Sequence, residues 1–233
     1  MKMLRLLVLS AVLAMASGLA KADPMTVMTV QAVSTSDQDA YVAMIAKINA
    51  AVKATIGIET YRHVWVGDFA GEDSHAIYIV SSYPSAAAVY QDNEKLKNVP
   101  EIQLTMAQMK DMRKLGSSTL YKAVREEGVY AGGAVFNTSV AVTDEAAYLK
   151  ALDGLKALFD ANGFKDAKLN LYRAAAGRTA PATHLVVISF PNSVRAGEFI
   201  DVIYDKGILD QWNVTAAKCR TSLGNGTYHE ITK

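Results

Sequence analysis

Apolar residues recur at spacings of three and four in two distant stretches of this 233-residue chain. The first stretch runs from Tyr41 to Val52, and the second runs from Tyr148 to Phe159. This spacing places the apolar side chains on one face of a helix, since an α-helix has about 3.6 residues per turn. Gly57 and Gly163 follow the two stretches, and glycine favours the left-handed turn that ends many helices. The pattern therefore predicts two amphipathic helices, each with one buried face.

The two helices belong to an internal repeat, in which matching positions are separated by a constant offset along the chain. The apolar positions Tyr41, Ile45, Ile48 and Val52 recur as Tyr148, Leu152, Leu155 and Phe159. The tripeptide Ser-Tyr-Pro at 82–84 recurs as Ser-Phe-Pro at 189–191 at the same offset, whereas Leu115-Gly116 matches Leu223-Gly224 at an offset one position longer. Such a repeat predicts that both halves of the chain share one architecture.

Each half follows the order strand, helix, strand, strand, helix, strand. In the first half we predict strands at 26–33, 58–66, 76–80 and 118–124, a helix capped by Ser36, and a helix from Pro84 that Pro100 interrupts and that continues over 102–115. In the second half we predict strands at 134–142, 167–172, 185–188 and 227–231, a helix capped by Thr143, and a helix from Pro191 that Gly207 breaks.

This order is that of the ferredoxin-like unit, in which two helices cover one face of a four-stranded antiparallel sheet. The consecutive apolar residues Ile77, Tyr78, Ile79 and Val80 indicate that the strands are buried on both faces. We therefore expect the uncovered faces of the two sheets to pack together. The predicted fold class is α+β, with two tandem ferredoxin-like βαββαβ units (23–127 and 128–233) packed sheet to sheet as a pseudo-dimeric α/β barrel.

The duplication, the element order and the Tyr/Phe-Pro helix starts resemble the dimeric α/β barrel superfamily in its fused form, with both halves in one chain. The resemblance covers nearly all of the sequence after residue 22. Members include antibiotic-biosynthesis-type monooxygenases, muconolactone isomerases, dye-decolourising peroxidases and chlorite dismutases. The resemblance implies a cavity between the sheets, while the role of that cavity depends on the residues that line it.

Residues 1–22 have the pattern of a secretory signal. Lys2 and Arg5 precede a short apolar run at 6–16, and Ala20-Lys21-Ala22 matches the small-residue cleavage pattern. The run is shorter than the roughly 20 apolar residues that span a membrane. We therefore predict cleavage after Ala22 and a periplasmic or secreted protein that is not attached to a membrane after cleavage.

Charge and cysteine content limit the classes of partner. Cleavage after Ala22 would leave 21 basic and 23 acidic residues, a net charge of −2. A nucleic-acid partner is not predicted, because binding to phosphates requires clustered positive charge. Cys219 is the only cysteine, which excludes an internal disulfide. The predicted partner is a small-molecule ligand, and the sequence is also compatible with a homo-oligomer.

Candidate ligand-binding residues lie on the central strands, but two registers are open. In the first half, either Arg62 and Tyr78 or else His63 and Trp65 face the space between the sheets. In the second half, the choice is between the pair Asn170 and Tyr172 and the pair Leu171 and His184. A shift of one residue exchanges the two faces of a strand, so the sequence leaves both registers open. An alignment of the halves that matches His63 with Leu169 favours packing of His63 against the helices.

No histidine lies in a His-x-x-x-His or Glu-x-x-His spacing, and no nucleotide-binding or serine-hydrolase motif is present. We therefore predict neither a metal site nor a bound cofactor, and no catalytic residue is assigned. Three functions remain open: an exported protein that binds a small apolar or aromatic molecule between the sheets, a cofactor-independent monooxygenase or isomerase, and a non-catalytic structural or interaction protein. The first is favoured, because the sequence shows neither an acid–base pair nor a nucleophile–base pair.

Overall fold

The structure is a computed structural model that describes residues 26–58, 62–71, 76–177 and 180–232. The predicted signal, residues 1–22, lies outside the described residues. The first half comprises β1 (Val27–Thr35), α1 (Gln38–Ile56), β2 (His63–Phe69), β3 (Ile77–Tyr83), α2 (Ala86–Leu96), α3 (Pro100–Met109) and β4 (Arg113–Arg125). The second half comprises β5 (Ala134–Val142), α4 (Glu145–Ala161), β6 (Lys168–Ala176), β7 (His184–Phe190), α5 (Ser193–Asp205), α6 (Ile208–Ala216) and β8 (Arg220–Glu230).

The eight strands form one closed antiparallel barrel in the order β1-β3-β2-β8-β5-β7-β6-β4. Within each half the strand order is equivalent, β4-β1-β3-β2 in the first and β8-β5-β7-β6 in the second. The halves meet at two seams, where β2 pairs with β8 and β4 pairs with β6. The predicted pseudo-dimeric ferredoxin-like fold is confirmed. The two sheets also join edge to edge, so the backbone groups of their edge strands are paired.

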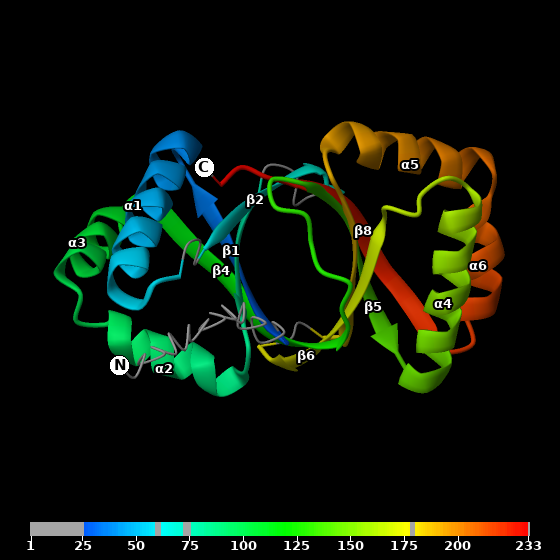
Figure 1. The fold of residues 1–233 in the computed structure, drawn as a ribbon, viewed down its shortest axis with the longest axis horizontal. Coiled ribbons are helices and arrows are strands. Elements are labelled where there is room, and N and C mark those ends of the chain that lie inside the picture. The colour runs from blue at the N-terminus through cyan, green and yellow to red at the C-terminus, as the bar shows by residue number, and fades with distance from the viewer. Residues whose placement is uncertain (1–25, 59–61, 72–75, 178–179, 233) are drawn as a thin grey trace, which may run out of the picture.

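The helices lie outside the barrel, with α1, α2 and α3 on one side and α4, α5 and α6 on the other (Figure 1). The predicted apolar stripes of α1 and α4 are buried against the sheet of their own half. Each of these side chains is at most 1% exposed: Tyr41, Ile45, Ile48, Val52, Tyr148, Leu152, Leu155 and Phe159. Each half therefore has its own core between helices and sheet, separate from the barrel interior.

The first helix of each half begins one residue later than predicted. Asp37 caps α1 and Asp144 caps α4, and each side chain accepts a hydrogen bond from a backbone N–H three residues on, at 2.9 Å. Ser36 and Thr143, the predicted caps, precede them. A carboxylate at this position satisfies a free N–H and also lies favourably in the field of the helix dipole.

The last strand of each half is longer than predicted. The helix expected at 102–115 ends at Met109, and β4 begins at Arg113. In the same way β8 begins at Arg220 and contains Gly224. Gly116 does not end a helix but allows β4 to approach β1, since a Cβ there would lie 3.2 Å from the Cβ of Ala32.

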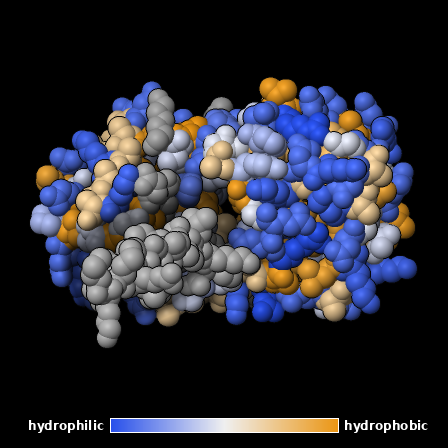
Figure 2. Space-filling model, viewed as in Figure 1, coloured by the Kyte–Doolittle hydropathy of each residue, from blue (hydrophilic) through white to orange (hydrophobic). Residues whose placement is uncertain are grey.

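Among the described residues, no helix is long and apolar enough to cross a membrane. Figure 2 shows mostly hydrophilic residues over the second half in this view, with apolar residues in small groups. The largest apolar side chains are accordingly found in the two helix–sheet cores and the barrel interior.

Candidate functional site

Strand pairing determines which residues face the barrel interior. On β2 and β3, Trp65 lies opposite Tyr78 and His63 lies opposite Val80, so these four side chains share one face. Val64, on the other face, packs in the core beneath the helices of the first half. His63 and Trp65 thus face the barrel interior, as one of the two alternatives predicted. Tyr78 lies on the same inward face, although the other alternative had grouped it with Arg62.

The second half follows the same pattern, at the offset that relates the two helix stripes. Tyr172 lies opposite Leu185 and Asn170 lies opposite Val187, so Asn170 corresponds to His63 and Tyr172 to Trp65. Leu171 faces the helix side of the sheet. The alignment that matched His63 with Leu169 was therefore wrong, and so was its consequence that His63 packs against the helices.

The barrel encloses a cavity of about 590 Å³, to which all eight strands contribute side chains. The segment between β4 and β5, residues 126–133 and here called the linker, adds Glu126, Val129, Tyr130 and Ala131. Among the aliphatic side chains of the wall lie six aromatic ones: Trp65, Tyr78, Tyr121, Tyr130, Tyr172 and Tyr228. The rings of Tyr78 and Tyr228 meet edge to face with centroids 5.4 Å apart, across the β2–β8 seam.

One wall of the cavity carries a histidine–carboxylate pair. Nδ1 of His63 lies 2.5 Å from Oε1 of Glu230, and the backbone N–H of Gly132 donates to Oε2 of the same carboxylate at 2.7 Å. Burial tends to raise the pKa of Glu230, but the hydrogen bonds from His63 and Gly132 outweigh it and lower that pKa below its ordinary value. Glu230 therefore fixes Nδ1 as a hydrogen-bond donor and leaves Nε2 as the nitrogen that can accept a proton.

A second polar group in the wall lacks a partner. Oδ1 of Asn137, on β5, is buried and has no hydrogen-bond partner among the described residues. A buried acceptor without a donor is unfavourable by about 1–3 kcal/mol, and most such groups are satisfied by protein, water or ligand. The side chain of Asn137 thus belongs to the wall, while its Oδ1 itself has almost no surface open to the cavity.

Solved structures of similar fold are found over most of the chain. A candidate monooxygenase from Fusobacterium nucleatum superposes with a TM-score of 0.57 at 11% identity, covering 89% of this chain and 93% of that one. A candidate monooxygenase from Lactobacillus acidophilus gives 0.55 at 10% identity over 88% and 94%. A haem-binding protein from Thermus thermophilus gives 0.51 at 9% identity over 88% and 91%.

The chain has the dimeric α/β barrel fold. Identities near 10% establish the fold alone. No protein-family model matches the sequence, and no curated protein matches it significantly. The function of this α/β barrel must therefore be argued from its own cavity.

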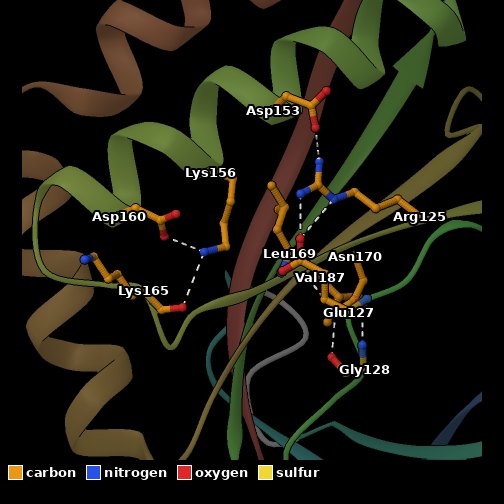
Figure 3. A network of polar contacts seen from close by, with 10 residues as sticks. All are labelled: Arg125, Glu127, Gly128, Asp153, Lys156, Asp160, Lys165, Leu169, Asn170 and Val187. Carbon is orange, nitrogen blue, oxygen red and sulfur yellow. Dashed lines mark hydrogen bonds and ion pairs between the residues drawn. The ribbon is translucent and has the colours of Figure 1, made fainter.

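The linker of this barrel is attached to the second half by Asn170, which is fully buried. Its Oδ1 accepts from the N–H groups of Glu127 and Gly128 at 2.7 and 3.1 Å, and its Nδ2 donates to the carbonyl of Gly128 at 2.9 Å (Figure 3). Arg125, at the end of β4, reaches both Glu127 and Asp153 of α4. Asn170 thus holds the linker rather than lining the cavity.

Two further attachments hold the linker at its other end. The N–H of Tyr130 donates to Oγ of Ser189 at 3.0 Å, and its phenol donates to the carbonyl of Asp166 at 2.9 Å. The bond from Gly132 to Glu230 completes the series. The linker therefore forms a fixed part of the cavity wall.

Two other predicted site residues lie outside the barrel interior. The backbone of Arg62 is bound by Asn49 of α1, and its guanidinium approaches the sulfur of Met106 on α3 at 3.8 Å. His184 is buried on the helix side of β7, where its Nε2 lies 2.9 Å from Glu145 at the start of α4. Among the predicted residues, His63, Trp65, Tyr78 and Tyr172 come together in the cavity wall.

Several wall residues were not singled out from the sequence, among them Tyr121, Glu126, Asn137, Tyr228 and Glu230. The Glu126 charge and, to a larger extent, burial raise the pKa of Tyr172, while burial raises the pKa of Tyr121. Both phenols therefore remain neutral hydrogen-bond donors at physiological pH. The constant offset that relates the two helix stripes also relates the strands of the two halves. Applying it to the strands would have shown which face of each strand points inward and so identified much of this wall.

Proposed function

We propose that the protein is an exported binding protein that holds a small molecule with a largely apolar or aromatic body inside the barrel. The cavity carries this proposal, because a volume of about 590 Å³ lined by aliphatic and aromatic side chains matches the size and lining of small-molecule sites, which span roughly 300–1,000 Å³. The separate helix–sheet cores support it further, since they stabilise each half without filling the barrel interior.

The polar groups of the wall are few, as in most binding sites that combine affinity with orientation. His63, with Nε2 not engaged by Glu230, and the side chain of Asn137 lie in this wall. The neutral phenol of Tyr172 adds a hydrogen-bond donor. A bound molecule with an aromatic body and one or two polar groups would match this arrangement.

A variant that fills the cavity tests the proposal. Val187 is 6% exposed and lies in the wall, so Val187→Phe should occupy ligand space without unfolding the barrel. Val194 is 74% exposed on α5, and Val194→Phe is the matched control. Native mass spectrometry of the protein from its natural source should detect a bound small molecule that Val187→Phe loses and Val194→Phe retains. Equal retention by both variants would place the ligand elsewhere.

The export part of the proposal depends on residues 1–22, where Lys2, Arg5 and the Ala20-Lys21-Ala22 pattern have the features of a signal. Expression in a bacterium followed by fractionation should yield a periplasmic or secreted protein whose mass corresponds to a start at residue 23. A cytoplasmic protein that retains residues 1–22 would refute export and leave the binding proposal intact.

A second candidate function is a cofactor-independent isomerase or monooxygenase, and the His63–Glu230 pair favours it. A histidine held by a carboxylate can act as a general base toward an acidic C–H or O–H group. If so, a bound ligand should exchange its acidic proton with D₂O in the presence of the wild-type protein. His63→Gln should abolish that exchange while binding persists.

The fold is shared with a haem-binding protein, so we tested whether haem suits this cavity. Haem carries two propionates, which commonly pair with basic side chains. The described wall residues include Glu126 and Glu230 but no Arg or Lys. The residues do not fit haem, and we propose no role for it.

A further inference from the structure

The charges of the cavity wall are unbalanced. Its described residues include the carboxylates Glu126 and Glu230 but no Arg or Lys side chain. Glu230 is engaged by His63 and by the N–H of Gly132. Glu126 is an exposed side chain of the lining and has neither a hydrogen bond nor an ion pair with any described residue, so among the wall residues nothing but solvent balances its charge.

The neighbours of Glu126 in the chain explain why it lacks a partner. Arg125 directly precedes it, but the guanidinium turns away from the cavity to Glu127 and Asp153 (Figure 3). Partial burial raises the pKa of Glu126, although the side chain remains exposed to solvent. The same carboxylate contributes to the raised pKa of Tyr172, which shows that its field reaches the aromatic wall.

That wall is suited to hold positive charge. Aromatic ring faces attract cations electrostatically, most strongly when several rings surround the cation and exclude water. Trp65 and Tyr172 are 8% and 4% exposed, and Tyr121, Tyr78 and Tyr228 lie in the same wall. Lys168 lies over the ring of Tyr130 at 3.9 Å from the centroid, but its side chain is not part of the wall.

We propose that the cavity selects an organic ammonium: a compact apolar or aromatic body that carries one positively charged nitrogen. Glu126 supplies the counter-charge, and the rings of Trp65 and the wall tyrosines surround the apolar body and the cation. This inference rests on the proposed binding function and specifies the charge of its ligand.

Two probes of equal shape isolate the effect of charge. Benzyltrimethylammonium and neopentylbenzene differ in one atom, a positive nitrogen in place of a carbon. Titration of the full protein followed by ligand-observed NMR should show the cation binding about tenfold more tightly than its neutral counterpart. Added salt should weaken the binding of the cation but not that of neopentylbenzene, because dissolved ions screen interactions between charges.

Two variants test whether residues of the cavity wall cause the preference for the cation. Glu126→Gln should reduce the affinity for the cation about tenfold and leave the affinity for neopentylbenzene unchanged. Glu94→Gln is the matched control, because Glu94 is an exposed carboxylate on α2 outside the cavity. Trp65→Leu should reduce the ratio of the affinity for the cation to the affinity for neopentylbenzene. This ratio can be interpreted even if the substitution weakens the binding of both probes.

The two proposals fail in different ways. If neopentylbenzene binds as tightly as the cation, the cavity binds apolar molecules and the charge preference is wrong. If the cation binds more tightly but Glu126→Gln and Trp65→Leu leave the ratio unchanged, the cationic site lies elsewhere and the inference is overturned. If neither probe binds, the ammonium proposal falls, and the Val187→Phe experiment decides the fate of the binding proposal separately.

Discussion

His63 in the first half and Asn170 in the second occupy equivalent positions, opposite Val80 and Val187 respectively. His63 pairs with Glu230 in the cavity wall, whereas Asn170 binds the backbone of the linker. The cause is topological, because a linker follows β4 and reaches the second half, while β8 is followed by no such connection within the described residues. The repeat thus places a polar residue at both positions, and only His63 lines the cavity.

The helix–sheet cores of the two halves differ as well. Phe199 of α5 packs against four other phenylalanine rings, with centroid distances from 4.7 to 6.3 Å: Phe136, Phe159, Phe164 and Phe190. The equivalent residue of α2 is Asp92, whose carboxylate contacts Lys95 at 3.3 Å. The second half therefore has an aromatic core, and the first half has a smaller, mainly aliphatic one.

The largest effect expected from this difference is that of Phe199→Ala. Loss of a fully buried aromatic ring should lower the free energy of unfolding by about 3–5 kcal/mol. Asp92→Ala, at the equivalent position, should lower it by less than about 1 kcal/mol. Denaturant titration measures both, and equal losses would show that the two cores do not differ energetically.

Truncation within the matched helix stripes should have the next largest effect. Ile48→Ala and Leu155→Ala each remove buried aliphatic atoms and should cost about 2–5 kcal/mol. A larger loss for Leu155→Ala would fit the tighter aromatic surroundings of the second half. Losses below about 0.5 kcal/mol in urea titrations would contradict the burial of the stripes.

Asn170→Ala tests the role of the linker. It leaves the N–H groups of Glu127 and Gly128 without their acceptor and should cost about 1–3 kcal/mol. Hydrogen exchange at these two amides should accelerate. His63→Ala should leave that exchange unchanged, and acceleration in both variants would mean that the equivalent positions share one structural role.

The smallest expected effect is a change in how steeply the stability of the protein falls at low pH. The lowered pKa of Glu230 means that the unfolded chain binds more protons than the folded one in acid. This contribution is complete above the ordinary glutamate pKa of about 4.3 and is lost as the pH falls through the lowered folded value. Glu230→Gln should therefore flatten the fall of the urea midpoint as the pH drops below about 4.3. Asp166→Asn, which removes a more exposed carboxylate whose pKa Arg195 lowers, should flatten it less.

Local signals made much of the fold predictable. The stripes at Tyr41–Val52 and Tyr148–Phe159 could be predicted because they follow the period of a helix. The repeat could be predicted because both halves contain such a stripe. The glycine-based boundaries were less reliable, because Gly116 and Gly224 lie inside strands whose ends are set by pairing with β1 and β5. Backbone pairing of that kind depends on partners far away in the sequence.

The cavity was predictable in location but not in content. A one-residue error in aligning β2 with β6 exchanged the two faces of the strand and assigned His63 to the wrong side. The partner of His63 could not be found from spacing, since Glu230 lies 167 residues away along the chain. An inward-facing Asn170 was one of the two alternatives left open, but the sequence did not show that the linker would bind it.

The order of synthesis adds a constraint that follows from the position of β8. This strand pairs with β5 in its own half and with β2 in the other, so one seam of the barrel cannot form before residues 220–230 have been made. Until then β2 has one unpaired edge, and the first half must persist with that edge exposed. An incomplete nascent chain therefore exposes a strand edge that can pair with a neighbouring chain, and a truncation before β8 should make the protein more prone to aggregate.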